Sequence, residues 1–378
     1  MNNLDEERVR STSILHIAPI ADNQITGLTV AIPRVVKSLH QIGVKTGILT
    51  TEFSNPYTLI EPYPVVHIRE LPLYSAISAM PKPLNQPNLI IFHSTYIPDH
   101  AWLAYQSYCQ GIPYVICPHG GMTKGAQQVK RWKKMAGNIL FFNWMVTHAV
   151  ALHCLTELEA TDVKIWKRPI FIVGNSVELP PKEKIAFSRK QEELQFVFIG
   201  RLDINHKGLD LLLKACSLAQ NSLREARVKI HLYGPDIKGS RNIIENIIDN
   251  YQIQDFVYLH NPILGLDKHA VLQQADLFIH TSRFEGHPTA VLEAMAYGIP
   301  CLLTPGTNIA TEVSVANAGW SVEPNPEAIA NTLLCILQAR SQLQSKGYAA
   351  RSLVENKYSS EQIGMQLLQE YTNLLNKN

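Results

Sequence analysis

Short apolar runs of strand length alternate along this chain with longer segments whose apolar residues recur at helical spacing. This alternation is typical of an α/β fold with parallel sheets, because a helix usually carries the chain from one parallel strand to the next. The expected strands lie at residues 13–18, 44–50, 65–68, 89–93, 114–117, 151–155, 169–173, 194–199, 227–233, 257–260, 277–280 and 299–303. The expected helices lie at residues 28–41, 98–110, 209–218, 328–339 and 360–375.

Residues 276–304 contain the most informative of these units. An apolar strand at 277–280 is followed by a polar loop at 281–287, and a helix begins near Pro288 and stops at Gly298. Proline suits the first turn of a helix, where its missing N–H costs nothing. The helix N-terminus therefore follows the carboxyl end of a strand, and its free N–H groups and partial positive charge favour phosphate.

Two carboxylates flank this predicted phosphate site. Glu285 lies in the loop, and Glu293 lies inside the helix. Taken singly, each is better explained as an ordinary solvated charge. Taken together, they could accept hydrogen bonds from the paired hydroxyls that sugars offer on either side of a phosphate.

A second loop with suitable charges follows the expected strand at 194–199. It reads GRLDINHKG and contains Arg201 and Lys207. Two cations at the carboxyl edge of a parallel sheet are suited to neutralise a leaving diphosphate. Ordinary solvated loop charges remain the alternative.

Two loops in the first half of the chain are further candidates. His119 lies in the string PHGG directly after a strand, at the edge where parallel sheets bind ligands. The alternative is a loop histidine with a structural hydrogen bond. Gly27 lies where the first predicted helix begins, although a single glycine is also common in ordinary turns. His93 and Ser94, at the end of a neighbouring strand, are less favoured.

The string from Glu285 to Pro300 fills every fixed position of the pattern E-G-x-P-x-x-x-x-E-A-[MA]-A-x-G-x-P. In this string the chain resembles the retaining glycosyltransferases of family 4 (group 1 type), which have the GT-B fold. Residues 200–208 are similar to that family's G-R-L-x-x-x-K-G segment, with one more residue before the lysine. The resemblance implies an α/β protein with two Rossmann-like parallel-sheet domains that face each other across a cleft. The boundaries expected are an N-terminal acceptor-side domain at 1–174, a linker at 175–190, a nucleotide-sugar-binding domain at 191–358, and a terminal helix at 359–378 that crosses back to the first domain.

The resemblance also implies roles for individual residues. The catalytic residues would be His119, Arg201, Lys207 and Glu285. In two places the chain departs from the family pattern, because Gly27 lacks an adjacent glycine and His260 stands where a glycine is usual. The residues implied to bind the nucleotide sugar are Gly27, Arg201, Lys207, Gly234, Pro262, Leu264, Glu285, Gly286, His287, Pro288, Thr289, Ala290 and Glu293.

Composition restricts the partners and cofactors. The chain has 378 residues and a net charge of +2, which gives no support to nucleic-acid binding. Its six cysteines are scattered without CxxC spacing, so we expect buried free thiols and neither zinc nor disulfides. The sequence contains no Asp-x-Asp, so a metal-independent reaction is expected. The first residues are polar and carry both charge signs, and no apolar run is long enough to span a bilayer, which favours the cytoplasm.

The predicted reaction is transfer of a sugar from a nucleotide diphosphate sugar, with UDP-glucose favoured, to a hydroxyl of a glycan or lipid-linked acceptor in envelope or exopolysaccharide synthesis. A sugar-nucleotide epimerase of the same fold and a non-catalytic sugar-nucleotide-binding protein are the alternatives. A nicotinamide oxidoreductase is disfavoured, because no GxGxxG follows the first strand. Residues 124–148 join a basic run to an apolar run, which predicts either a solvated helix leading into the core or peripheral contact with the inner face of the membrane.

Overall fold

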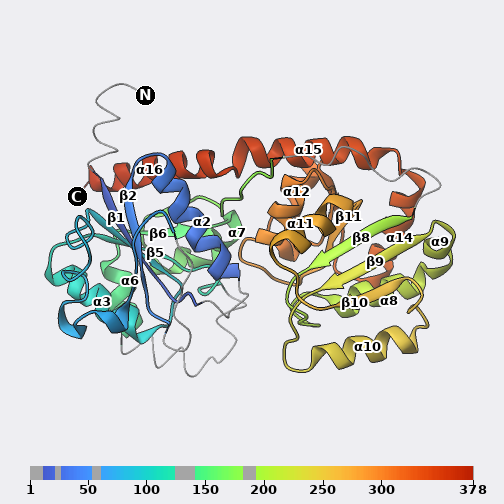
Figure 1. Cartoon of the computed structure of the whole chain (residues 1–378), viewed down its shortest axis with the longest axis horizontal. Helices are drawn as coiled ribbons and strands as arrows, with labels where there is room; N and C mark the ends of the chain where they lie inside the picture. Colours follow the sequence, from blue (N-terminus) through green and yellow to red (C-terminus); the bar gives the residue numbers. More distant parts are fainter. Residues whose placement is uncertain (1–11, 22–26, 53–60, 124–140, 182–192, 378) are drawn as a thin grey trace. The chain divides into compact units, whose positions relative to one another are not determined.

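The structure is a computed structural model that describes residues 12–21, 27–52, 61–123, 141–181 and 193–377. The chain divides into two compact units (Figure 1). The first unit joins Met1–Ser176 to Ser359–Asn378, and the second unit is Val177–Tyr358. Each unit is built on a parallel sheet of its own.

The sheet of the first unit has the strand order β3-β2-β1-β4-β5-β6-β7, and all its pairs are parallel. Every residue of β1, β4, β5 and β6 is buried, as expected for strands covered on both faces. The chain adds β2 and β3 on one side of β1 and then crosses over to β4 on the other side. The strands are β1 (Ser13–Ala18), β2 (Lys45–Thr50), β3 (Val65–His67), β4 (Leu89–His93), β5 (Tyr114–Cys117), β6 (Ala151–Cys154) and β7 (Ile170–Ile172).

Helices cover this sheet, and the last helix of the chain belongs to it. α16 packs on α2 so closely that a Cβ added at Gly364 would lie 2.7 Å from the carbonyl oxygen of Ser38. A glycine is therefore needed at that contact. The helices of this unit are α2 (Gly27–Gln41), η1 (Ile68–Glu70), η2 (Leu73–Ser75), α3 (Pro98–Cys109), α6 (Asn143–His148), α7 (Glu157–Val163), η4 (Lys164–Trp166) and α16 (Ser360–Leu375).

The sheet of the second unit has the order β10-β9-β8-β11-β12-β13, again with parallel pairs throughout. The chain builds β9 and β10 on one side of β8 and then crosses to β11 on the other side. The strands are β8 (Leu194–Ile199), β9 (Val228–Tyr233), β10 (Val257–His260), β11 (Leu277–His280), β12 (Cys301–Leu303) and β13 (Gly319–Ser321).

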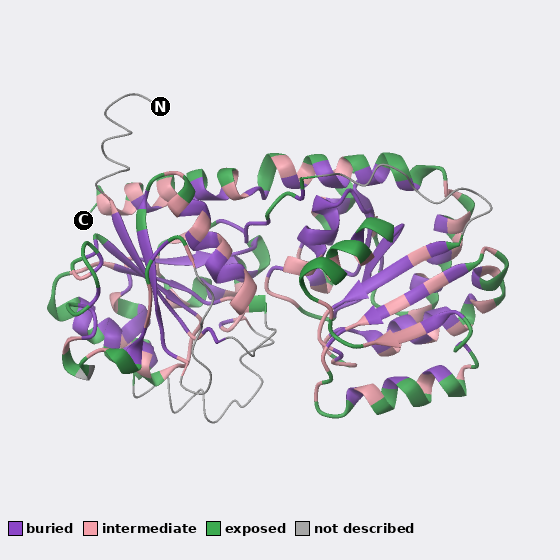
Figure 2. Ribbon diagram, viewed as in Figure 1, coloured by how far each residue is buried: buried purple, intermediate pink, exposed green. Residues whose placement is uncertain are grey.

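Side chains of each sheet pack against helices, and Figure 2 shows the strands of the first unit as largely buried. In the second unit the core joins Phe196 and Phe198 of β8 to the leucines of α8. The helices of the second unit are α8 (Leu209–Leu218), α9 (Gln220–Glu225), α10 (Ser240–Asn250), α11 (Gly265–Gln274), α12 (Thr289–Ala296), η5 (Pro305–Thr307), α13 (Ala310–Val315), α14 (Pro326–Gln338) and α15 (Gln342–Lys357).

All twelve predicted strands are present, most with their ends displaced by no more than one or two residues. The helices α9, α10, α11, α13 and α15 and the short strand β13 were not predicted. In α11 the only buried residue is Leu272, so no apolar stripe marks that helix in the sequence. The prediction of buried thiols is wrong for Cys109 and Cys335, which are exposed, and right for the other four cysteines.

Among the residues that the structure describes, no helix combines the length and the apolar character needed to cross a bilayer. Of the segment 124–148, for which membrane contact was one prediction, residues 124–140 lie outside the described residues. Its described end contains α6, in which Met145 and Val146 are buried.

Candidate functional site

The charged residues predicted in the second half of the chain come from two adjacent strands. β8 and β11 are parallel neighbours, with Leu277 paired to Phe196. After β8 the chain continues to β9 on one side of the β8–β11 pair, and after β11 it continues to β12 on the other side. Such a switch point in the strand order is where open α/β sheets bind ligands. The loop after β8 contains Lys207, and the loop after β11 contains Glu285. The structure therefore brings together residues that lie far apart in the sequence.

Backbone contacts fix these two loops against each other. Gly208 has φ +62° and caps α8, and a Cβ added there would lie 2.0 Å from the carbonyl oxygen of Thr281. The Thr281 hydroxyl donates to the Gly208 carbonyl at 3.0 Å. The backbone N–H of Arg283 donates to the His206 carbonyl at 3.0 Å. Because glycine alone tolerates so close an approach, the loops hold a fixed geometry before any ligand arrives.

Glu285 is the centre of the site. Its Oε1 atom accepts a hydrogen bond from Lys207 Nζ, another from Ser282 Oγ at 2.6 Å, and a third from His280 Nε2 at 3.1 Å. The side chains of Lys207 and Glu285 are only 10% and 11% exposed, so this is a buried ion pair. Among the residues that the structure describes, all three donors converge on Oε1, and none of the three bonds to Oε2.

The titration of this cluster follows from its burial and its charges. Burial alone would raise the pKa of Glu285, but the charge of Lys207 and the hydrogen bond from His280 outweigh it and hold that pKa far below the usual range. Burial, assisted by the charge of Lys207, lowers the pKa of His280. At neutral pH the site therefore contains a carboxylate, an ammonium and a neutral imidazole.

Arg201 lies in the same loop as Lys207 and is partly exposed. Its Nη2 atom lies 3.3 Å from Nδ1 of His206, whose ring stacks on Phe284 with 4.2 Å between the ring centroids. The Arg201 guanidinium, held by His206 and Phe284, can present its remaining N–H groups to an anion.

The helix after Glu285 begins as predicted, with Pro288 as the residue before α12. Glu293 is buried within α12, and its Oε2 accepts a hydrogen bond from Lys268 Nζ of α11. The ring of His287 is buried and lies 5.2 Å from the ring of Tyr358, and burial lowers its pKa to about 3. The His287 ring thus packs into the unit, and the backbone is what this residue can offer a ligand.

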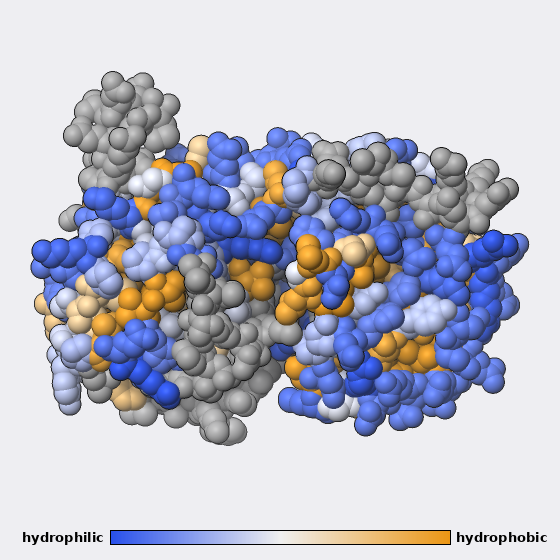
Figure 3. All heavy atoms as spheres, viewed as in Figure 1, coloured by the Kyte–Doolittle hydropathy of each residue, from blue (hydrophilic) through white to orange (hydrophobic). Residues whose placement is uncertain are grey.

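Three further predicted residues lie on neighbouring loops of the second unit. A Cβ at Gly234 would lie 1.7 Å from the carbonyl oxygen of Gly200, so this glycine is needed to bring the loops after β8 and β9 together. Pro262 follows β10, and Leu264 precedes α11; both are exposed. Leu266 is 85% exposed, and Figure 3 shows hydrophobic surface around α11. Gly286, Thr289 and Ala290 are only partly buried.

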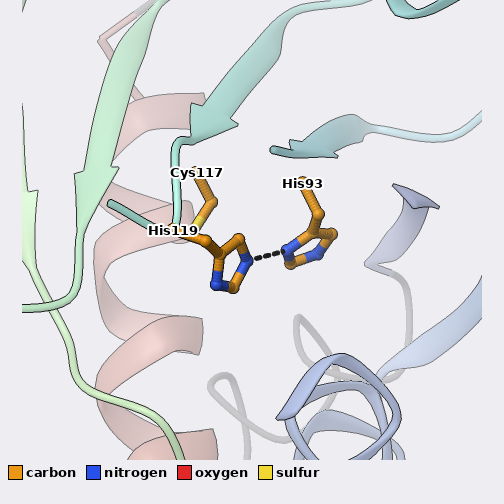
Figure 4. Close-up of side chains that lie close together, drawn as sticks. All are labelled: His93, Cys117 and His119. Atoms are coloured by element: carbon orange, nitrogen blue, oxygen red, sulfur yellow. Dashed lines mark hydrogen bonds between the residues drawn. The ribbon is translucent and has the colours of Figure 1, made fainter. Parts of the chain in front are cut away.

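The remaining predicted residues belong to the first unit. Gly27 is the first residue of α2, and no atom lies within 4 Å of where its Cβ would be. His119 has φ +49°, and its Nε2 lies 2.9 Å from Nδ1 of His93 (Figure 4). Glu159 holds this loop, because its Oε1 accepts from the Gly120 N–H at 2.6 Å. Burial lowers the pKa of His119 to about 3, so its imidazole is neutral at pH 7.

The described residues include one group with the chemistry of a soft metal site. The ligand atoms of His93, Cys117 and His119 all lie within 4.8 Å of one another (Figure 4). Nitrogen and thiolate ligands of this kind suit zinc. The predicted substrate residues Lys207, Glu285 and Glu293 form no such group in the described part of the chain.

Sequence reasoning missed several residues of these clusters. His280 and Ser282 lie in the quoted string, but their convergence on one oxygen of Glu285 required the loop geometry. Lys268 lies on α11, which carries no helical signal. Glu159 stands three residues after Thr156 in a capped helix start, and that spacing could have indicated its position.

Comparison with known proteins finds a family model that matches the part of the chain containing this site. Residues 181–353 match the family model described as "Glycosyl transferases group 1". A curated relative, the "Putative colanic acid biosynthesis glycosyltransferase WcaL" of Escherichia coli (strain K12), is 30% identical over 213 residues. That match covers 50% of this chain and 50% of the relative, so the chain spans about half the length of the curated relative it matches.

Solved structures resemble the chain over nearly its whole length. The sucrose-phosphate synthase (tll1590) from Thermosynechococcus elongatus has a TM-score of 0.75 at 17% identity, and the match covers 97% of this chain and 100% of that one. Anabaena Alr3699/HepE, solved in complex with UDP and glucose, has a TM-score of 0.71 at 13% identity, with 96% and 100% covered. At these identities the likeness shows the fold, which is GT-B.

Proposed function

We propose that the chain belongs to the group 1 glycosyl transferases, whose family model matches residues 181–353, and that it transfers a sugar from a nucleotide diphosphate sugar to a hydroxyl group of an acceptor. We further propose UDP-glucose as the donor and a glycan or lipid-linked saccharide of the cell envelope or exopolysaccharide as the acceptor. The reaction would retain the configuration at the anomeric carbon, as the family resemblance implies, and would take place in the cytoplasm without a metal ion.

The observation that carries this proposal is the arrangement around Glu285. Three donors hold its Oε1 at the ligand-binding edge of the sheet, and none of the three bonds to Oε2. A carboxylate oxygen with open lone pairs accepts hydrogen bonds from neighbouring hydroxyls of a sugar. Since the carboxylate is already positioned by the protein, little ordering remains to be done when the sugar binds.

The leaving group sets the second requirement. A departing nucleoside diphosphate gains negative charge on its β-phosphate, and fixed positive charge must stabilise it. Lys207 donates one of its three N–H groups to Glu285, and the other two can reach phosphate oxygens. Arg201 and the N-terminus of α12 at Thr289 and Ala290 supply further donors on the same edge of the sheet. Gly27 at the start of α2 is a further proposed phosphate contact.

The other predicted residues complete the donor site. Glu293, oriented by Lys268, would hold the ribose hydroxyls, and the backbone near Gly234, Pro262 and Leu264 would contact the phosphate and the base. His119 would contact a hydroxyl of the transferred sugar. No glutamate is assigned as a proton acceptor, because in the family's usual mechanism the leaving phosphate takes the acceptor proton.

Two of the comparisons favour UDP-glucose among the possible donors. The Anabaena protein of the same fold was solved with UDP and glucose, and the relative from Escherichia coli is described as a glycosyltransferase of colanic acid biosynthesis. A thermal-shift screen with UDP, GDP and ADP sugars, each with and without EDTA, tests base, sugar and metal independence together. We expect stabilisation by UDP-glucose that EDTA leaves unchanged. Stabilisation by none of these sugars would contradict the proposal.

Peripheral membrane contact near residues 124–148 is a finer proposal. At the described end of this segment, Trp144 of α6 lies against Tyr105 and Tyr108 of α3, with ring centroids 5.7 and 5.5 Å apart. Tyr108 and Phe141 are 55% and 56% exposed. Exposed tyrosine and tryptophan are typical of surfaces at the membrane interface. Cosedimentation with anionic vesicles should be reduced by Tyr108→Ala; equal binding by variant and wild type would contradict this.

Two alternatives differ in their products. An epimerase would convert the donor sugar without an acceptor, and a binding protein would leave the donor intact. Incubation of one donor with a hydroxyl acceptor, followed by separation of sugar nucleotides and glycosides, distinguishes the three. A new glycoside together with free nucleoside diphosphate is the result expected.

A further inference from the structure

Three histidines form a continuous chain across the sheet of the first unit. Nδ1 of His16 in β1 lies 2.9 Å from Nε2 of His93, the last residue of β4. Nδ1 of His93 in turn lies 2.9 Å from Nε2 of His119, which follows β5 (Figure 4). In the sheet register His16 pairs with Ile91, so His93 lies two positions further along and on the same face.

The three histidines lie where this sheet would bind a ligand. β1 and β4 are the neighbouring strands at which the strand order reverses. His93 ends β4 and His119 follows β5, so both lie at the carboxyl edge of this sheet, where such folds bind ligands. His16 and His93 are 0% and 1% exposed, whereas His119 is partly exposed. The histidines therefore connect the core of the unit to its ligand-binding edge.

The contact between the nitrogens of His93 and His119 has the length of a hydrogen bond, which is shorter than the separation of two nitrogens on one zinc ion. Two imidazole nitrogens bound to one tetrahedral zinc ion lie about 3.3 Å apart, since each Zn–N bond is about 2.0–2.1 Å. His93 and His119 approach to 2.9 Å, which is the ordinary length of an N–H···N hydrogen bond. Cys117 completes a possible ligand group, but the two histidines already satisfy each other.

The direction in which the three histidines donate their hydrogen bonds follows from His16, the buried end of the row. Nε2 of His16 is buried and has no partner among the residues that the structure describes. Two other buried histidines show which kind of nitrogen this protein leaves unpaired. His153 donates through Nε2 to the Val173 carbonyl, and His280 donates through Nε2 to Glu285, so each leaves a bare Nδ1 lone pair. A buried N–H without an acceptor is rarer in proteins than an unused acceptor.

If Nε2 of His16 carries no hydrogen, the positions of the ring hydrogens on all three histidines follow. His16 must then carry its hydrogen on Nδ1 and donate it to His93 Nε2. His93 carries its hydrogen on Nδ1 and donates it to His119 Nε2. His119, whose Nε2 is thus occupied as an acceptor, carries its own hydrogen on Nδ1. Burial lowers the pKa of His16 and His119 to about 3, so neither ring takes a second proton at neutral pH.

We propose that His16 and His93 are positioning residues that hold His119 as the neutral Nδ1–H tautomer, ready to donate a hydrogen bond to an oxygen atom of the transferred sugar. The sugar contact rests on the function proposed above, whereas the tautomer does not. Nothing in the family pattern of the sequence indicates His16, which lies in the middle of a buried strand.

The tautomer is measured directly by long-range ¹H–¹⁵N correlation spectra of histidine-labelled protein at neutral pH, with His119 assigned by loss of its signals in His119→Gln. The wild type should show a protonated Nδ1 and a bare Nε2 on His119. In His93→Phe the donor to Nε2 is gone, and the His119 signals should move towards the Nε2–H form. His93→Asn, whose amide can replace the Nδ1 donor, should restore the wild-type pattern.

His153→Phe is the matched control. His153 is buried in the neighbouring strand β6, but it bonds to the Val173 carbonyl and not to any of the three histidines. The variant should leave the His119 tautomer unchanged. A wild-type His119 protonated on Nε2, or an identical tautomer in His93→Phe, would overturn the proposal.

Kinetics separate the chain from the proposed function. His93→Phe should lower kcat about tenfold, the size of one oriented hydrogen bond to the sugar, while the KM for the donor changes little and His93→Asn recovers most of the loss. If the tautomer shifts but kcat does not, the sugar contact of His119 is wrong. If the wild type transfers no sugar from any nucleotide sugar, the proposed function fails. The spectra would still test whether His16 and His93 set the tautomer of His119.

Discussion

Removal of the ammonium group of Lys207 should destabilise the second unit in a way that depends on pH. In Lys207→Met the Glu285 carboxylate stays buried and retains only the hydrogen bonds from His280 and Ser282. Breaking a buried ion pair from one side typically costs about 3–5 kcal/mol. The carboxylate can limit this cost by taking up a proton.

The limit can be worked out from the titration. Protonating a carboxyl group whose ordinary pKa is 4.5 costs about 1.36 kcal/mol for each pH unit above that value. At pH 7 the electrostatic cost therefore cannot exceed about 3.4 kcal/mol, and at pH 5 it cannot exceed about 0.7 kcal/mol. In the wild type the folded pKa of Glu285 is lowered, so its stabilising contribution is present above pH 4.5 and is lost as the pH falls below it. The difference between variant and wild type should accordingly shrink from pH 7 to pH 5, by at most about 2.7 kcal/mol.

Hydrogen exchange of peptides from β11 and α8, corrected for intrinsic rates at each pH, measures this difference within the second unit. Arg224→Met is the control, since its partner Asp255 is 54% exposed and surface pairs contribute little at either pH. Lys207→Met combined with Glu285→Leu should recover most of the lost protection, because no charge is then left buried. An equal loss at pH 7 and pH 5 in Lys207→Met would show that packing, and not charge, accounts for the effect. The same single variant should lower sugar transfer by about 10²–10³, as expected for loss of one fixed donor to the leaving group.

Three further predictions concern other parts of the chain. The first unit should lose thermal stability as the pH falls below 6.5, because burial lowers the pKa of His16 and His100 to about 3 and the unfolded chain binds more protons; a flat melting temperature between pH 7.5 and 5 would contradict this. Lys268→Met should weaken UDP binding about tenfold, measured by titration calorimetry, since Glu293 loses the group that orients it, and an unchanged Kd would show that the pair has no role in binding. Gly234→Ala should lower the free energy of unfolding by about 1–3 kcal/mol or more in denaturant titrations, because its Cβ would overlap the backbone, whereas Gly27→Ala, with open space around it, should not.

The sequence by itself determined most of the elements and the family that the chain resembles. Apolar runs such as 89–93 and 277–280 become buried strands because a strand covered on both faces needs apolar residues throughout. The fixed positions from Glu285 to Pro300 identified the start and the end of α12, because proline and glycine act locally on backbone conformation. Such features depend on neighbours in the chain, and a linear sequence contains them.

The tertiary structure alone decided which of these residues meet. Lys207 and Glu285 are 78 residues apart, and only the pairing of β8 with β11 brings their loops into contact. The chain His16–His93–His119 likewise depends on the register of three strands, which no local pattern specifies. Hydrogen-bond partners and burial set the proton positions and pKa values of these groups, and both are properties of the packed fold that a sequence pattern does not contain.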